Sequence, residues 1–154
     1  MAEYDELASG VESAGNEIFW IGPASIEQVQ RLENLLGTKL PVSFRRFLED
    51  YGGGGVVSAE ISGIQNDDAS DVSGGTVLGD TATCRERFDL PSHLVVIYFQ
   101  DDEVCWCLDV SESGVQESPV VSYNVFTGKV DGAIASNFRN FMRQHLALYS
   151  IRAV

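Results

Sequence analysis

Two consecutive helical patterns in the first third of the chain constrain the fold more than any other feature. Apolar residues recur every three or four positions over 26–36 and again over 43–51, which predicts two amphipathic helices. Ser25 and Gln28 form a capping box before the first helix, and Gly37 is placed to end it in a left-handed turn. The expected apolar stripe of the first helix is Ile26, Val29, Leu32 or Glu33, Leu35 and Leu36.

Four glycines, Gly52–Gly55, follow the second helix. A phosphate-binding loop needs a strand before its glycines and a helix after them, usually with a lysine. Here the helix comes first and no lysine follows closely. A helix C-cap and a flexible turn that leads into a strand over Val56–Ile64 is therefore the better interpretation. Residues 65–75 have the composition of a loop.

The remainder combines two more helical patterns with a group of strands. A helix is expected over Glu3–Ser13. A second is expected within Val77–Phe88, where the threonine and glycine content lowers the helix propensity. Strands are expected at Leu94–Phe99, Val104–Val110 and Pro119–Tyr123. A loop over 111–118 is expected before the third of these strands. The second strand alternates, with Trp106 and Leu108 on one face and Cys105 and Cys107 on the other. A closing helix is expected from Ile134, Phe138, Phe141, Met142, His145, Leu146 and Tyr149.

Helices thus open and close the chain, and the strands lie together in its middle. This order predicts an α+β fold, formed as a single domain over residues 1–154. We expect a central antiparallel sheet, flanked by the N- and C-terminal helices, with helices packed against one side of it.

Acidic side chains outnumber basic ones by 23 to 10, so the formal net charge of the 154-residue chain is 10 − 23 = −13. Residues 1–20, 51–80 and 91–128 contain acids and no lysine or arginine. Nucleic acids and anionic membranes are therefore unfavourable partners, whereas a cationic protein is a favourable one. The alternative is that the acidity only keeps the protein soluble.

The same residues indicate a cellular compartment. No apolar run approaches the roughly 20 residues of a membrane-spanning helix. The first 15 residues carry four acids and no base, unlike a secretory signal. Three cysteines, an odd number, give no disulfide framework. We therefore expect a cytoplasmic protein with reduced thiols.

No arrangement of residues argues for catalysis, a metal or a cofactor. Cys105 and Cys107 lack the second ligand pair of a structural zinc site, and their spacing is not that of a redox dithiol, so buried thiols are expected. Of the two histidines, His93 and His145, the second lies on an apolar stripe and is expected to be structural. Adjacent carboxylates in the polar turns could bind a metal, but such pairs are usually solvated. We therefore expect a protein that is not an enzyme.

The segment from Ile26 to Gly54 resembles the opening signature of the SUKH superfamily, which includes fungal cell-wall-assembly regulators and bacterial immunity proteins. The resemblance extends in order through much of the chain, from about Ile18 to Leu148. Its pieces are Leu32-Glu33, Leu36-Gly37, Leu40-Pro41, Ser43-Phe44-Arg45, Phe47-Leu48, Gly52-Gly53-Gly54, Leu94-Val95-Val96-Ile97, Val104-Cys105-Trp106-Cys107-Leu108-Asp109, Ser118-Pro119-Val120-Val121, Ser136, Phe138 and Phe141.

This resemblance implies an α+β domain that binds and neutralises a toxin, often a nuclease, and it carries over no catalytic residue. The first hypothesis is a cytoplasmic immunity protein whose acidic surface occludes the basic active-site surface of a cationic nuclease toxin. The second is a regulatory protein-interaction module of cell-wall or signalling type. The oligomeric state stays open.

Two acidic segments are the predicted partner-binding residues, because both are polar, turn-like and free of bases. The first segment contributes Asp67, Asp68 and Asp71, and the second contributes Asp101, Asp102 and Glu103.

Overall fold

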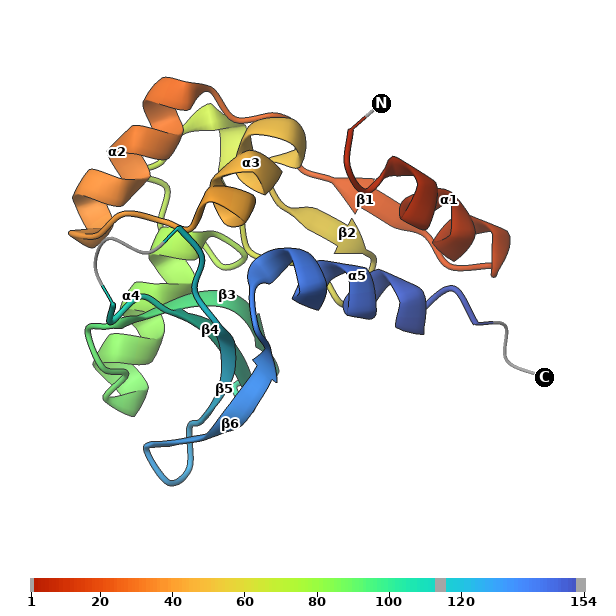
Figure 1. The fold of residues 1–154 in the computed structure, drawn as a ribbon. Coiled ribbons are helices and arrows are strands. Elements are labelled where there is room, and N and C mark those ends of the chain that lie inside the picture. The colour runs from red at the N-terminus through yellow and green to blue at the C-terminus, as the bar shows by residue number, and fades with distance from the viewer. Residues whose placement is uncertain (1, 113–115, 152–154) are drawn as a thin grey trace.

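The computed structural model describes residues 2–112 and 116–151, and these form the predicted α+β fold (Figure 1). The helices are α1 (Asp5–Ser13), α2 (Ile26–Leu36), α3 (Val42–Tyr51), α4 (Val77–Phe88), α5 (Phe138–Leu148) and the short 3-10 turn η1 (Gln65–Asp67). The strands are β1 (Ile18–Trp20), β2 (Gly54–Val56), β3 (Leu94–Gln100), β4 (Val104–Asp109), β5 (Val120–Asn124) and β6 (Lys129–Ala135). Part of the predicted loop over 111–118, namely 113–115, lies outside the described residues.

The main sheet is an antiparallel meander in the order β3-β4-β5-β6. The first three strands were predicted, but β6 was not. Ile134, assigned from sequence to the last helix, belongs to β6, and α5 begins only at Phe138. The sequence prediction failed because most of β6 is exposed, so it shows no alternation of buried and exposed residues.

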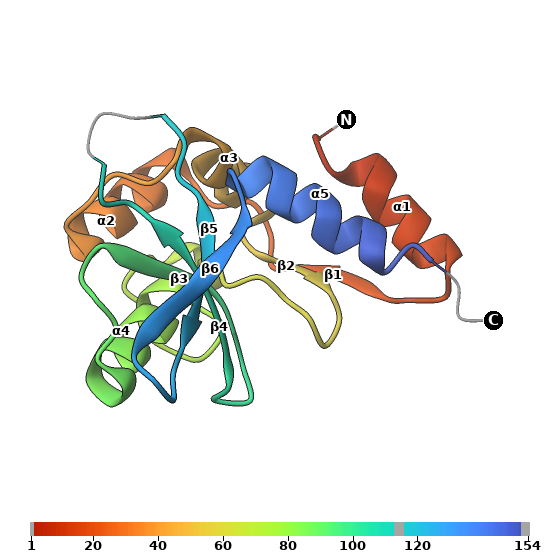
Figure 2. The same cartoon turned by 60° about the horizontal axis from the view of Figure 1, so that its bottom comes forward.

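Helices cover both faces of this sheet, so the expectation of helices on one side is wrong (Figure 2). Val95 and Ile97 of β3 join a cluster that includes residues of α3 and α5. Val96 joins Cys84 of α4 in a second cluster on the opposite face. The alternation along the strands produces this division, because successive side chains point to opposite faces of a sheet. The exception is the irregularity in β3, where Ile97 and Tyr98 both join the larger cluster.

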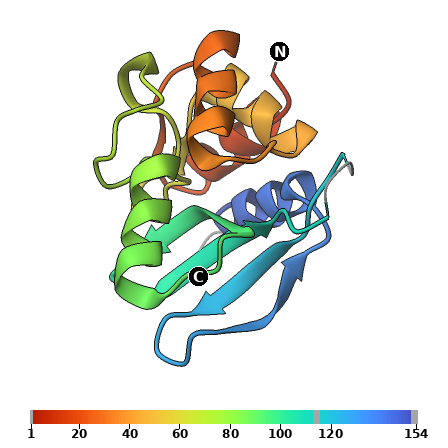
Figure 3. The ribbon, with the colours of Figure 1, turned by 90° about the vertical axis from the view of Figure 1, so that its left-hand side faces the viewer.

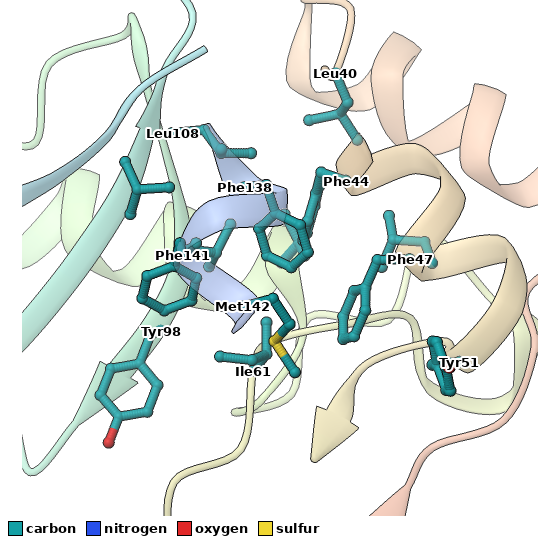
Figure 4. Packing of buried hydrophobic residues seen from close by; sticks show 14 of the residues in the cluster. Leu40, Phe44, Phe47, Tyr51, Ile61, Tyr98, Leu108, Phe138, Phe141 and Met142 are labelled. Atoms are coloured by element: carbon teal, nitrogen blue, oxygen red, sulfur yellow. The ribbon is translucent and has the colours of Figure 1, made fainter. Parts of the chain in front are cut away.

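The larger cluster is rich in aromatic rings (Figure 4). Phe44 and Phe47 of α3 pack against Phe138 of α5, with ring centroids 4.9 and 5.1 Å apart. Trp106 of β4 stacks on Tyr98 at 4.4 Å and meets Phe141 edge-on. These contacts join the helical layer to the sheet, and each such pair adds about 0.5–1.5 kcal/mol beyond area burial.

A second, two-stranded sheet pairs β1 with β2. This sheet corrects the predicted strand over Val56–Ile64 and the predicted flexible turn at Gly52–Gly55. Only residues as far as Val56 continue as a strand, whereas Ile61 returns to bridge Gly54. Gly52–Gly55 are buried, so they do not form a flexible turn on the surface. At Gly52, which ends α3 with a left-handed φ of 75°, a Cβ atom would lie 1.7 Å from the Gly22 carbonyl oxygen. The glycines therefore allow backbones to cross where no side chain fits.

The first predicted helix, α2, differs from expectation at its start and along its stripe. The Ser25 hydroxyl accepts from the Gln28 amide as predicted. The Gln28 side chain, however, does not return to Ser25. Its Oε1 accepts from the Ala69 amide instead. Ile26 and Leu35 are exposed, and the buried residues are Val29, Leu32, Glu33 and Leu36.

Candidate functional site

The first predicted acidic segment lies in the loop between β2 and α4, beside α2 (Figure 3). Asp67 Oδ1 accepts from the Ser25 amide at 2.8 Å, the bond that sequence reasoning had assigned to Gln28. Ala69 is buried and its amide donates to Gln28. The loop is therefore held to the body of the protein, and Asp67 has a structural role in addition to any contact with a partner.

The other two acids of this segment organise the loop itself. Asp68 accepts from the amide and hydroxyl of Ser70, and Asp71 does the same with Ser73. These hydrogen bonds are the main reason that the pKa of each carboxyl is lowered. Arg31 of α2 also lies 3.9 Å from Asp68. Arg31, which is distant in sequence, thus partly neutralises the negative charge of a segment that contains no basic residue.

The second predicted segment is the turn between β3 and β4, and all three of its acids are exposed. Asp101 and Asp102 have left-handed φ values of 55° and 54°, and the Glu103 amide donates to the Gln100 carbonyl. This geometry is the mirror-image turn that suits a twisted hairpin. Arg87 of α4 contacts Asp102 at 3.3 Å, so Asp101 and Glu103 are the members of this turn without a recorded ion pair among the described residues.

The structure does not gather the six carboxylates into one cluster, but it brings the two segments to the borders of connected hollows. A hollow of about 180 Å³ is lined by Asp67 and shares Ile21 and Gln65 with a second of about 260 Å³. Gln100, which precedes Asp101, lines the second hollow. Asp67 therefore lines one end of this stretch of surface and the turn 101–103 begins beside the other end, whereas Asp68 and Asp71 line neither hollow.

Sequence reasoning missed the residues that continue this surface. A third hollow, of about 330 Å³, shares Phe19 and Glu60 with the second and is also lined by Glu17 and Val57. We call the three connected hollows the acidic groove, because their charged lining residues are Asp67, Asp80, Glu60 and Glu17. A phenylalanine in a short apolar stretch was the available signal, but only the fold exposes it and places Glu60 in the same hollow.

Asp80 is the buried member of the groove, with 6% of its surface exposed. It accepts from the Ser62 hydroxyl at 2.6 Å and from the Gly75 amide at 3.2 Å. Burial raises the pKa of this carboxyl, against the effect of both hydrogen bonds. Asp80 therefore fixes the groove wall, whereas Glu17 and Glu60 have no recorded ion pair among the described residues.

A hollow of about 470 Å³ beside the α2–α3 loop is larger but chemically mixed. Its lining includes Glu33, Glu112 and Lys39. Glu33 is buried and accepts from the Leu40 amide at 2.7 Å, which fixes the loop. With charges of both signs, this hollow does not favour one class of ligand.

The thiols are buried, as predicted for Cys105 and Cys107. Cys105 Sγ lies 3.6 Å from Cys107 Sγ and 3.8 Å from Cys84 Sγ, which α4 supplies. Hydrogen bonding to Cys105, followed by burial, raises the pKa of the Cys84 thiol, so it stays protonated and unreactive near neutral pH. Within 2–112 and 116–151, no three His, Cys, Asp or Glu side chains are grouped to hold a metal ion.

His145 is structural, as its place on the apolar stripe predicted. It is buried between Tyr98, Phe141 and other rings, and its Nε2 lies 3.0 Å from the Ala59 carbonyl. The carbonyl can only accept, so the ring nitrogen donates. Burial lowers the pKa of this imidazole. His145 thus joins α5 to the segment that follows β2.

The fold and its surface define a class of α+β proteins built around a helix-covered meander with an acidic, grooved exterior. In the part of the chain described by the structure, no helix has the length and apolar character needed to cross a bilayer. Residues 5–147 match the SUKH_5 family model, described as SMI1-KNR4 cell-wall. The chain belongs to this family. Membership supports an immunity or protein-interaction role, and members are generally non-catalytic.

Proposed function

We propose that the protein is a cytoplasmic immunity protein that neutralises a cationic nuclease toxin by occluding its active-site surface. The observation that carries the proposal is the excess of acidic over basic side chains in a chain of this family. The net charge is −13, and both predicted acidic segments lie on exposed turns. A nuclease must attract a polyanionic substrate with lysines and arginines, so an acidic protein surface can compete for the same residues.

Inhibition by this route needs no chemistry from the immunity protein. The acidic turn at 101–103 and the loop with Asp67, Asp68 and Asp71 meet the basic cleft of the toxin and exclude nucleic acid. Charges at the rim of such an interface accelerate association, while desolvated pairs near its centre contribute more to affinity. The partner-binding assignment of these six residues stays a prediction.

The decisive experiment tests whether a gene beside that of this chain encodes a toxin domain and whether the protein neutralises that domain. Cells that express that domain should survive only when they also express the protein, and the two purified proteins should form a complex that prevents nucleic-acid cleavage. Binding should weaken as the salt concentration rises. A neighbouring toxin that binds the protein weakly or kills cells in its presence would contradict the proposal.

The second candidate is a non-catalytic regulatory interaction module of cell-wall or signalling type. The description of the matched family model, which refers to the cell wall, favours it. Deletion of the gene in the absence of any toxin separates the two functions. An immunity protein should then be dispensable, whereas a regulator should leave the cells with altered sensitivity to wall-damaging agents.

A further inference from the structure

The structure assigns to Glu17, Phe19 and Glu60 a binding site for a single arginine or lysine side chain of a partner protein. That the partner is a toxin rests on the proposed function. The site adds to that function one basic side chain that the toxin would insert into the hollow. All three residues line the same hollow of about 330 Å³.

The fold builds the site from two segments. Glu17 and Phe19 flank the start of β1, and Glu60 lies in the segment that follows β2. The Val57 amide donates to the Glu17 carbonyl at 2.9 Å, and β1 pairs with β2 from Ile18↔Val56 to Trp20↔Gly54. The two sides of the hollow are thus fixed by backbone hydrogen bonds.

An aromatic ring lines the same hollow as the two carboxylates. Phe19 is 61% exposed and Val57 is 38% exposed, so the hollow has an apolar surface that no described residue covers. The face of a phenylalanine ring attracts a cation, most often a guanidinium. The methylene groups of a long basic side chain could cover Val57 while its charged end meets the acids.

The carboxylates themselves lack partners. The four recorded ion pairs of the described residues use Asp68, Asp50, Asp102 and Glu3, and neither Glu17 nor Glu60. Oε1 of Glu60 is buried and accepts no hydrogen bond in the structure. A buried acceptor without a donor costs free energy, so the Glu60 carboxylate gains when it turns toward a guanidinium in the hollow, which carries five donors.

The rest of the groove has the same sign. The charged residues that line the two connected hollows are Asp80 and Asp67, in addition to Glu60, and none is basic. A basic segment that places one side chain between Glu17 and Glu60 can therefore extend along the groove without meeting a like charge. The hollow beside the α2–α3 loop, which contains Lys39, does not offer this continuity.

The test uses an isolated side chain, so it does not depend on finding the toxin. The ¹⁵N-labelled full chain is titrated with N-acetyl-arginine amide and, in parallel, with N-acetyl-citrulline amide, which has a similar shape but no charge. We expect the largest saturable shifts at the amides of Phe19, Val57 and Glu60 with the arginine probe and none with the citrulline probe.

Paired variants keep the test specific. The double variant Glu17→Gln/Glu60→Gln should bind the arginine probe about fivefold more weakly, as expected for the loss of two ion pairs that are at least partly exposed to solvent. Phe19→Ala should also weaken binding, and because the Phe19 side chain is exposed, the variant should remain folded. The matched control, Glu12→Gln/Glu86→Gln, removes two exposed helical carboxylates and should bind as the parent does.

Shifts scattered over the whole acidic surface, or equal losses in the two double variants, would overturn the site. Such a result would leave the immunity function intact if co-expression still protects cells from the toxin. Conversely, localised arginine binding without protection would retain the site and contradict the proposed function.

Discussion

At the residue scale, the same side chains serve different purposes according to their surroundings. Asp67 and Asp101 are both exposed acids in polar turns, yet Asp67 holds the Ser25 amide whereas Asp101 occupies a left-handed turn position without a recorded ion pair. Phe19 and Phe47 differ in the same way. The first is 61% exposed, and the second is fully buried among aromatic rings. Residue type alone therefore does not separate binding residues from scaffold.

Phe47→Ala should lower the free energy of unfolding by about 3–5 kcal/mol, because it leaves a cavity among buried rings. Phe47 lies 5.1 Å from Phe138 and 6.2 Å from Trp20, measured between ring centroids. Urea denaturation measures the change, and Phe19→Ala provides the exposed control, with an expected effect within about 0.5 kcal/mol. A Phe47→Ala protein with parental stability but without partner binding would show that α3 is a binding element.

The free energy of unfolding should decrease as the pH falls below about 6.5, in part because of His145. Burial holds the pKa of His145 below this ordinary value in the folded protein. Between the two pKa values the unfolded chain therefore binds more protons, and acidification favours unfolding. The contribution reaches at most about 1.4 kcal/mol per pH unit in that window and vanishes above it.

Urea denaturation of the parent and of His145→Gln between pH 5 and pH 7.5 isolates this effect. Glutamine retains an amide donor but does not titrate. The parent should lose stability more steeply than the variant below pH 6.5. Parallel curves would mean that His145 titrates equally in both states.

At the element scale, short polar connections determine how helices and strands are held. The loop after η1 is joined to the start of α2 by Asp67 and Gln28. The turn between β5 and β6 is organised by Asn124, whose Oδ1 accepts from the amides of Phe126 and Thr127. Side chains that satisfy backbone amides in this way replace ladder hydrogen bonds where the chain reverses.

Asp67→Ala should destabilise the protein by about 0.5–2 kcal/mol, the usual cost of losing a side chain that caps a helix start. The Ser25 amide should also exchange its hydrogen faster, because its acceptor is gone. Asp71→Ala is the matched control, since Asp71 bonds only within its own loop to Ser73 and should change stability by less than about 0.5 kcal/mol. Equal effects of the two substitutions would show that the bond from Asp67 does not anchor α2.

At the scale of the whole molecule, helices cover both faces of the main sheet, and the charged lining residues of the acidic groove are all acidic. The helices α3 and α5 cover one face of the sheet and α4 covers the other. The groove runs from the β1–β2 sheet to the end of β3, where the turn 101–103 begins. An approaching cationic protein would thus meet the groove and the turn as one negative region.

The variant Asp101→Asn/Asp102→Asn/Glu103→Gln should slow association with a cationic toxin and reduce its dependence on salt, with little effect on the dissociation rate. Asparagine tolerates the left-handed conformation of the turn, so folding should be preserved. Stopped-flow measurements at several salt concentrations test this. The control Glu12→Gln/Glu27→Gln/Glu86→Gln removes the same charge elsewhere, and an identical slowing there would show that only net charge matters.

The sequence by itself determined the helices and three strands of the meander, and its net charge predicts that polyanionic partners are unfavourable. Helical spacing, strand alternation and net charge depend on near neighbours or on composition, so they can be read without a fold. Only the tertiary structure decided that β6 is a strand, because its pairing with β5 comes from backbone hydrogen bonds between residues with no buried pattern. Likewise, the sequence located two acidic segments, but only folding pairs Arg31 with an acid of the first segment and Arg87 with an acid of the second. Folding also places Glu60 in the same hollow as Phe19. Those relations join residues far apart in the chain, and packing alone brings them within reach.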